Sequence, residues 1–123
     1  MAKTIKSIFV KQQFYDEAIK LDPKMTKAYS EKGYILRQLN KFDEAIESFN
    51  KAIELDPKYF DPYLQKALCL DNLNKVDEAI EYYDKALALN PNDIGIYFNK
   101  GVLLSRMGEK EKGKECYEAG AKI

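Results

Sequence analysis

The side chains in this chain that could do chemistry are carboxylates, lysines and two thiols, because the sequence contains no histidine. Histidine is the usual general base and a common metal ligand near neutral pH. The nearest approach to a paired-carboxylate site is the Asp–Glu dipeptide at 16–17, 43–44 and 77–78. We interpret these pairs as structural, since acidic residues stabilise the start of a helix. The sequence therefore predicts no catalytic residue, no cofactor and no metal site.

The charge balance excludes several classes of partner. The 123 residues include 20 Lys+Arg and 20 Asp+Glu, which leaves no net charge. Proteins that hold nucleic acids or membrane surfaces need excess positive charge, so neither partner is expected. No apolar run approaches the roughly 20 residues that span a bilayer. Residues 1–10 lack the apolar core and cleavage site of a signal peptide, so we expect a cytoplasmic protein.

A repeat of 34 residues organises the chain. Residues 40–57, NKFDEAIESFNKAIELDP, return at 74–91 as NKVDEAIEYYDKALALNP, an offset of 34 residues (91 − 57). The same offset relates a column of tyrosines and a column of leucines: Tyr29, Tyr63 and Tyr97, then Leu36, Leu70 and Leu104. A fixed period of this length is typical of a repeat array.

Apolar residues recur at helical spacing within each half of the period. We expect seven helices, at residues 5–21, 26–39, 42–55, 60–73, 75–89, 94–107 and 109–121. An Asp–Pro or Asn–Pro pair at 22–23, 56–57 and 90–91 stops a helix and can also begin the next, its side chain accepting free N–H groups. Helices joined by links as short as residues 40–41 must lie antiparallel.

Small and large residues fall in separate columns. Gly33, Ala67 and Gly101 share one column, and Ala45 and Ala79 another, so we expect close helix crossings there. A column of aromatic residues fills the remaining space, with any hydroxyl at the edge of the core: Tyr15, Phe49, Tyr83 and Tyr117. Two thiols without metal-ligand spacing are expected to be free. Cys69 aligns with Ile35 and Leu103, which predicts burial, whereas Cys116 aligns with Ser48 and Tyr82 and is expected to be more exposed.

These columns resemble the tetratricopeptide repeat (TPR), a 34-residue helix-turn-helix unit. The matching residues are Tyr29, Gly33, Leu36, Ala45, Phe49, Ala52 and Pro57, then Tyr63, Ala67, Leu70, Ala79, Tyr83, Ala86 and Pro91. Lysine replaces the family's leucine at 32, 66 and 100. The resemblance implies an all-α solenoid of antiparallel helix pairs in a right-handed superhelix. A half-repeat (1–24) begins it, and repeats follow at 25–58, 59–92 and 93–123.

The last repeat departs from the pattern, with Gly113 and Gly120 in place of the alanines and Lys110 and Lys114 in place of apolar residues. A terminal unit must turn a polar face to water, so the final helix is interpreted as a cap. A marginal, frayed tail is the alternative.

The resemblance also implies that the first helices of successive units line a concave groove for an extended peptide or a partner helix. The positions that would face it are Lys27, Ser30, Tyr34, Arg37, Asp61, Leu64, Leu68, Asp71, Phe98, Val102, Ser105 and Arg106. Some family members bind a C-terminal carboxylate with a clamp of Lys, Asn and Arg. The matching positions here hold Ser30, Tyr34, Gln65, Gly95 and Asn99, so that ligand is not expected.

The function indicated is non-catalytic protein–protein interaction, as an adaptor or scaffold. Two alternatives remain open, a nucleic-acid-binding helical repeat similar to the pentatricopeptide family and a regulatory arm of an enzyme encoded elsewhere. The helix expected at 5–21 carries a broad apolar arc, only part of which can pack on residues 26–39. A homodimer through residues 5–21 is therefore a further hypothesis.

Overall fold

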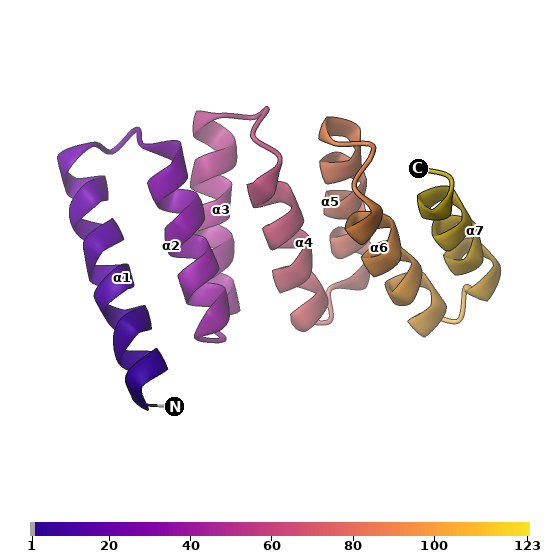
Figure 1. The fold of residues 1–123 in the computed structure, drawn as a ribbon, viewed down its shortest axis with the longest axis horizontal. Helices are drawn as coiled ribbons and strands as arrows, with labels where there is room; N and C mark the ends of the chain where they lie inside the picture. Colours follow the sequence, from indigo (N-terminus) through magenta and orange to yellow (C-terminus); the bar gives the residue numbers. More distant parts are fainter. Residues whose placement is uncertain (1) are drawn as a thin grey trace.

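The computed structural model describes residues 2–123, so Met1 of the expected half-repeat lies outside it. The described chain folds into helices α1 (Ala2–Leu21), α2 (Thr26–Gln38), α3 (Phe42–Leu55), α4 (Asp61–Asn72), α5 (Val76–Leu89), α6 (Ile94–Arg106) and α7 (Lys110–Ala121). They follow one another in a single row, with α3 and α5 behind α2, α4 and α6 in the view of Figure 1. Each expected helix is confirmed, and only the start of α1, at Ala2 instead of residue 5, differs by more than one residue.

The helices pack in pairs, α2 with α3, α4 with α5, and α6 with α7, while α1 packs on α2. The second helix of the first pair also contacts the first helix of the next, since α3 packs against α4. The chain is thus an all-α solenoid of antiparallel helix pairs, as the resemblance to the tetratricopeptide repeat implies.

The turn inside each pair depends on one residue in the left-handed region. Asn40 and Asn74 have φ of 60° and 61°, and Gly108 has φ of 89°. Asparagine and glycine tolerate this conformation better than other residues. A backbone hydrogen bond closes each of the two asparagine turns. Lys41 N donates to the Leu36 carbonyl at 2.9 Å, and Lys75 N donates to the Leu70 carbonyl at 2.8 Å. This closure satisfies carbonyls at the helix end and brings the second helix back along the first.

The Asp–Pro pairs do not begin the following helices, which corrects that part of the sequence interpretation. The carboxylates of Asp22 and Asp56 instead accept the N–H groups of Lys24 and Lys58, each at 3.1 Å. A side chain that bonds two residues ahead favours a turn, so the next helix begins only after the turn is complete. Among the first helices of the pairs, α6 has a side-chain cap, where Asp93 accepts the Ile96 N–H at 3.2 Å.

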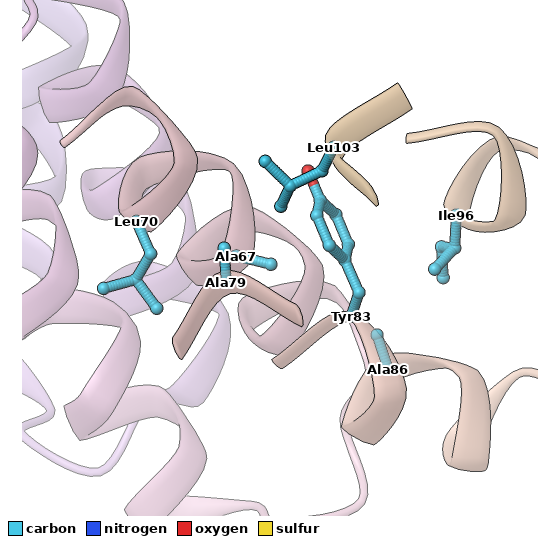
Figure 2. Close-up of a cluster of buried hydrophobic side chains, with 7 residues drawn as sticks. All are labelled: Ala67, Leu70, Ala79, Tyr83, Ala86, Ile96 and Leu103. Atoms are coloured by element: carbon cyan, nitrogen blue, oxygen red, sulfur yellow. The ribbon is translucent and has the colours of Figure 1, made fainter. Parts of the chain in front are cut away.

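The small residues lie at close helix crossings, as the columns predict. A Cβ on Gly33 would lie 2.5 Å from the Phe49 ring, and one on Gly101 would lie 2.6 Å from the Tyr117 ring. In the pair between them, the Tyr83 ring lies among Ala67, Ala79 and Leu103 (Figure 2), and every member of this buried cluster is inaccessible or nearly so. The aromatic rings at 49, 83 and 117 of the second helices therefore pack over a small residue of the partner helix.

The three lysines that replace leucine each bind the second helix of the preceding unit. Lys32 forms an ion pair with Asp16 at 2.8 Å. Lys66 donates to the Asn50 side chain at 2.6 Å, and Lys100 forms an ion pair with Asp84 at 2.5 Å. Their partners are themselves 34 residues apart, so this polar contact repeats at every junction between units and accounts for the departure from the family pattern.

Helix α7 is a continuous helix to Ala121, and its lysines at 110, 112 and 114 are exposed. Gly113 is buried, and a Cβ there would lie 2.8 Å from the Gly101 carbonyl oxygen. This glycine is therefore required by the close approach of α6 and α7. A polar outer face of this kind is what a capping helix needs, and the capping role itself stays a prediction.

Candidate functional site

The candidate site is the surface formed by α2, α4 and α6, the first helix of each pair. We call it the groove surface and define it by the twelve positions that the sequence predicts. Four of these are exposed, Lys27, Tyr34, Phe98 and Arg106; seven are partly buried, Arg37, Asp61, Leu64, Leu68, Asp71, Val102 and Ser105; and Ser30 is buried. Leu64 and Leu68 lie on α4, between α2 with its exposed Tyr34 and α6 with its exposed Phe98, and Val102 lies on α6 itself.

Ser30 is the one predicted groove position that is unavailable to a ligand. Its side chain is 1% exposed, and its hydroxyl donates to Asp61 Oδ2 at 3.0 Å. The two residues come from α2 and α4, which lie beside each other. The Ser30–Asp61 bond therefore joins two units instead of facing a ligand.

Charged side chains lie near the C-terminal end of each of the three groove helices, at Arg37, Asp71 and Arg106. Arg106 of α6 forms an ion pair with Asp71 of α4. Arg37 of α2 lies over the Tyr34 ring, 5.3 Å from its centroid, and its Nε is buried with no hydrogen-bond partner among the described residues. The Nε is too buried to reach a ligand, but a guanidinium carries further donors in its planar fork, and the partly exposed Arg37 can offer those to an acceptor.

The hydroxyl of Tyr83 is a polar group that the sequence prediction missed. The ring was expected to keep its hydroxyl at the edge of the core, but it points toward Leu103 in Figure 2, and its oxygen has no hydrogen-bond partner among the described residues. Burial raises the pKa of this phenol strongly, and nearby Asp71 adds to the effect. The one sequence feature that points to this burial is the alignment of Tyr83 with Phe49. Because phenylalanine fills the same position in the first pair, the position is suited to a buried ring without a hydroxyl.

The C-terminal end of the groove surface is aromatic. Phe98 is 59% exposed, and its ring centroid lies 6.0 Å from that of Tyr117. The two rings and Ile94 line a small hollow of about 200 Å³. Tyr117 is the counterpart of Tyr83, but Tyr83 is covered completely by the helix pair that follows it, whereas Tyr117 is 39% exposed.

The two thiols differ in accessibility as predicted, and both are free. Cys69 has no exposed surface, and burial raises the pKa of its thiol to about 11. Cys116 is partly exposed, with a smaller rise in the thiol pKa caused first by burial.

We expect Cys116 to react with dithiobis(nitrobenzoic acid) in the folded protein, and Cys69 to react more slowly by ~10²-fold or more, because it is reached only when the structure opens. The absorbance change at pH 8 measures both rates. Cys116→Ser should remove the fast phase, and guanidinium should make the remaining thiol fast. Two equally fast thiols in the native protein would contradict the burial of Cys69.

Comparison with known families agrees with this geometry. The family model described as Tetratricopeptide repeat matches residues 26–59 and 60–93, and a second model of the same description matches residues 82–115. Together the matches cover more than half of the chain. The chain belongs to the tetratricopeptide repeat family. Family members are protein-interaction scaffolds and are generally non-catalytic. No curated protein sequence matches the chain.

Solved structures similar to this TPR chain carry the name MamA. The "Crystal structure of MamA" superposes with a TM-score of 0.89 at 25% identity, covering 98% of this chain and 71% of that one. "MamA 41-end from Desulfovibrio magneticus RS-1" gives 0.88 at 19% identity, covering 98% and 68%. For a third, "Crystal structure of MamA protein", the TM-score is 0.85 at 23% identity, and the chain spans 61% of its length.

Two further findings concern membrane spans and metal sites. Within the part of the chain that the structure describes, no helix is long and apolar enough to cross a bilayer. Across the same residues, no three acidic or thiol side chains are grouped so that they could hold a metal ion.

Proposed function

We propose that this chain is a non-catalytic adaptor that binds an extended peptide or a helix of a partner protein on its groove surface. The observation that carries the proposal is the pair of exposed aromatic rings, Tyr34 and Phe98, on the same surface as the partly buried Leu64, Leu68 and Val102. Aromatic residues around an apolar centre are the usual hot spots of protein interfaces. Arg37, which is partly exposed, supplies a cationic contact beside Tyr34.

We do not expect the proposed adaptor to bind nucleic acid, because a chain with no net charge lacks the excess positive charge that holds phosphates. The compartment we propose is the cytoplasm, where the two free thiols would stay reduced.

A pair of charge substitutions tests the use of the groove surface. We expect the double variant Tyr34→Asp/Phe98→Asp to weaken partner binding by about tenfold or more, because it removes both aromatic anchors and adds charge to a surface that must lose water. The partner is first captured with the wild-type chain and identified by mass spectrometry, and its affinity for each purified variant is then measured by calorimetry.

The matched control is Leu89→Asp, which places the same charge on an apolar side chain of α5 that is 38% exposed, close to the 39% of Tyr34. This control should bind as tightly as the wild type. Equal binding by the groove variant and the wild type would show that partners dock elsewhere.

Self-association through α1 is a second proposal, supported by the exposed apolar face of that helix. Five apolar side chains of α1 are at least half exposed: Ile5, Phe9, Val10, Phe14 and Leu21. An antiparallel pairing of two α1 helices would bury Ile5 and Phe9, which lie one turn apart on the same side of the helix.

We expect light scattering at micromolar concentration to show a dimer of the 14.2 kDa chain, and Phe9→Asp to return it to the monomer, because a charge cannot be buried in that face without a large cost. Circular dichroism serves as the control that the variant stays folded. A wild-type chain that is already monomeric, with a mass unchanged by Phe9→Asp, would rule out this dimer.

A further inference from the structure

A cavity of about 550 Å³ opens between α5, α6 and α7, away from the groove surface. Its walls include Ile80 of α5, Tyr97, Lys100 and Leu104 of α6, and Cys116 of α7. None of these residues belongs to the groove surface, because α6 presents its other side, with Phe98 and Val102, to the groove. A cavity of this size falls in the range that binds ligand groups.

At the preceding junction, 34 residues earlier, an aromatic ring of the chain itself lies against the counterparts of two of these walls, Tyr63 and Lys66. That ring belongs to Tyr82 of α5. It stacks on Tyr63 with centroids 6.3 Å apart and an interplanar angle of 26°. The Lys66 and Lys85 ammonium groups lie 4.0 and 4.5 Å from its centroid. Stacking on a ring and contact with cations both favour an aromatic occupant over an aliphatic one.

The second junction keeps the tyrosine and one of the two lysines of this arrangement but lacks the ring, and Ala119 stands at the position of Lys85. Tyr97 stands at the position of Tyr63, and Lys100 at that of Lys66. Lys100 is also held in the same way, by Asp84 on α5, as Lys66 is held by Asn50 on α3. The residue that replaces Tyr82 is Cys116, whose small side chain lines the cavity. Helices α5 and α6 also contact each other less extensively than α3 and α4 do.

We propose that this cavity, which we call the ring pocket, is a second docking site, and that it receives one aromatic side chain of a partner polypeptide. The inserted ring would stack on Tyr97, contact the Lys100 ammonium group, and cover Ile80 and Leu104. At the junction of α5, α6 and α7, the inserted ring would take the place that Tyr82 has at the preceding junction. The ring pocket is independent of the groove surface, so it stands even if the groove binds nothing.

The test is a titration of the ¹⁵N-labelled chain with two acetylated, amidated peptides, Gly-Gly-Phe-Gly-Gly and Gly-Gly-Leu-Gly-Gly. We expect saturable shifts of the amide signals of Leu104, Cys116 and Ala119 with the phenylalanine peptide, and an affinity about tenfold lower for the leucine peptide. Cys116→Tyr should fill the pocket with the chain's own ring and abolish these shifts. Cys116→Ser, which keeps a small side chain as Ser48 does in the first unit, should bind the phenylalanine peptide like the wild type.

A second variant keeps the test informative if Cys116→Tyr does not fold. Tyr97→Leu removes the stacking partner but not the cavity, and we expect it to lower the affinity for the phenylalanine peptide by about fivefold while leaving the leucine peptide unaffected. Circular dichroism checks that each variant remains helical. The proposal is overturned if the two peptides bind equally, if no saturable shift occurs, or if folded Cys116→Tyr binds as well as the wild type.

Discussion

Truncation of Phe49 to alanine is expected to lower the free energy of unfolding by about 3–5 kcal/mol, a large share of the stability of a small domain. The side chain has no exposed surface and packs with Leu36, Ala45 and Cys69 in one buried cluster. Its ring lies directly against the backbone of Gly33, so the space it leaves cannot be filled by a neighbouring side chain without movement of α2. The free energy lost by removing the apolar ring from the core and the cost of the cavity that remains therefore add together.

Urea denaturation followed by circular dichroism at 222 nm measures this loss. Phe98→Ala is the matched control, because it makes the same change at a ring that is 59% exposed, and we expect it to cost less than about 1 kcal/mol. A similar loss for the two variants would mean that Phe49 is not a core residue of the first pair.

Enlargement of Ala79 to leucine is expected to destabilise the protein by about 1–3 kcal/mol or more, because it overfills a helix crossing. Ala79 has no exposed surface and lies in the cluster with Ala67, Leu70 and Tyr83 (Figure 2). The methyl group already fills the space between α4 and α5, so three further carbons must push the helices apart or displace the Tyr83 ring. Either movement also weakens the contact with Leu103 of the next unit.

The control for this prediction is Ala88→Leu, the same substitution on the same helix at an exposed alanine. Chemical denaturation of both variants separates the cost of overfilling from any change in helix propensity, which is small for Ala to Leu. A loss below about half a kcal/mol for Ala79→Leu would show that this crossing is loose.

For the candidate groove residues, spacing in the sequence predicts which face of the helix each occupies, but not how buried each side chain is. The spacing of Tyr34 and Phe98 within their units was enough to place both on exposed positions. The same reasoning placed Ser30 on that face, and the structure buries it against Asp61, 31 residues further on. A position on one helix is buried only if the next unit approaches it closely. The distance between two units cannot be predicted from the pattern of residues within one repeat.

Local structure follows from the sequence alone. The 34-residue period, the asparagines that permit the left-handed turn at 40 and 74, and the small residues opposite Phe49 and Tyr83 act over one helix pair, so residue type and spacing were sufficient to place seven helices. Contacts between units depend instead on how the pairs stack: the partner of each lysine at 32, 66 and 100, the buried hydroxyl of Tyr83, and the cavity beside Cys116. These contacts join side chains from different units, and their geometry exists only after the helix pairs have stacked, because stacking sets which side chains meet and how much water remains between them.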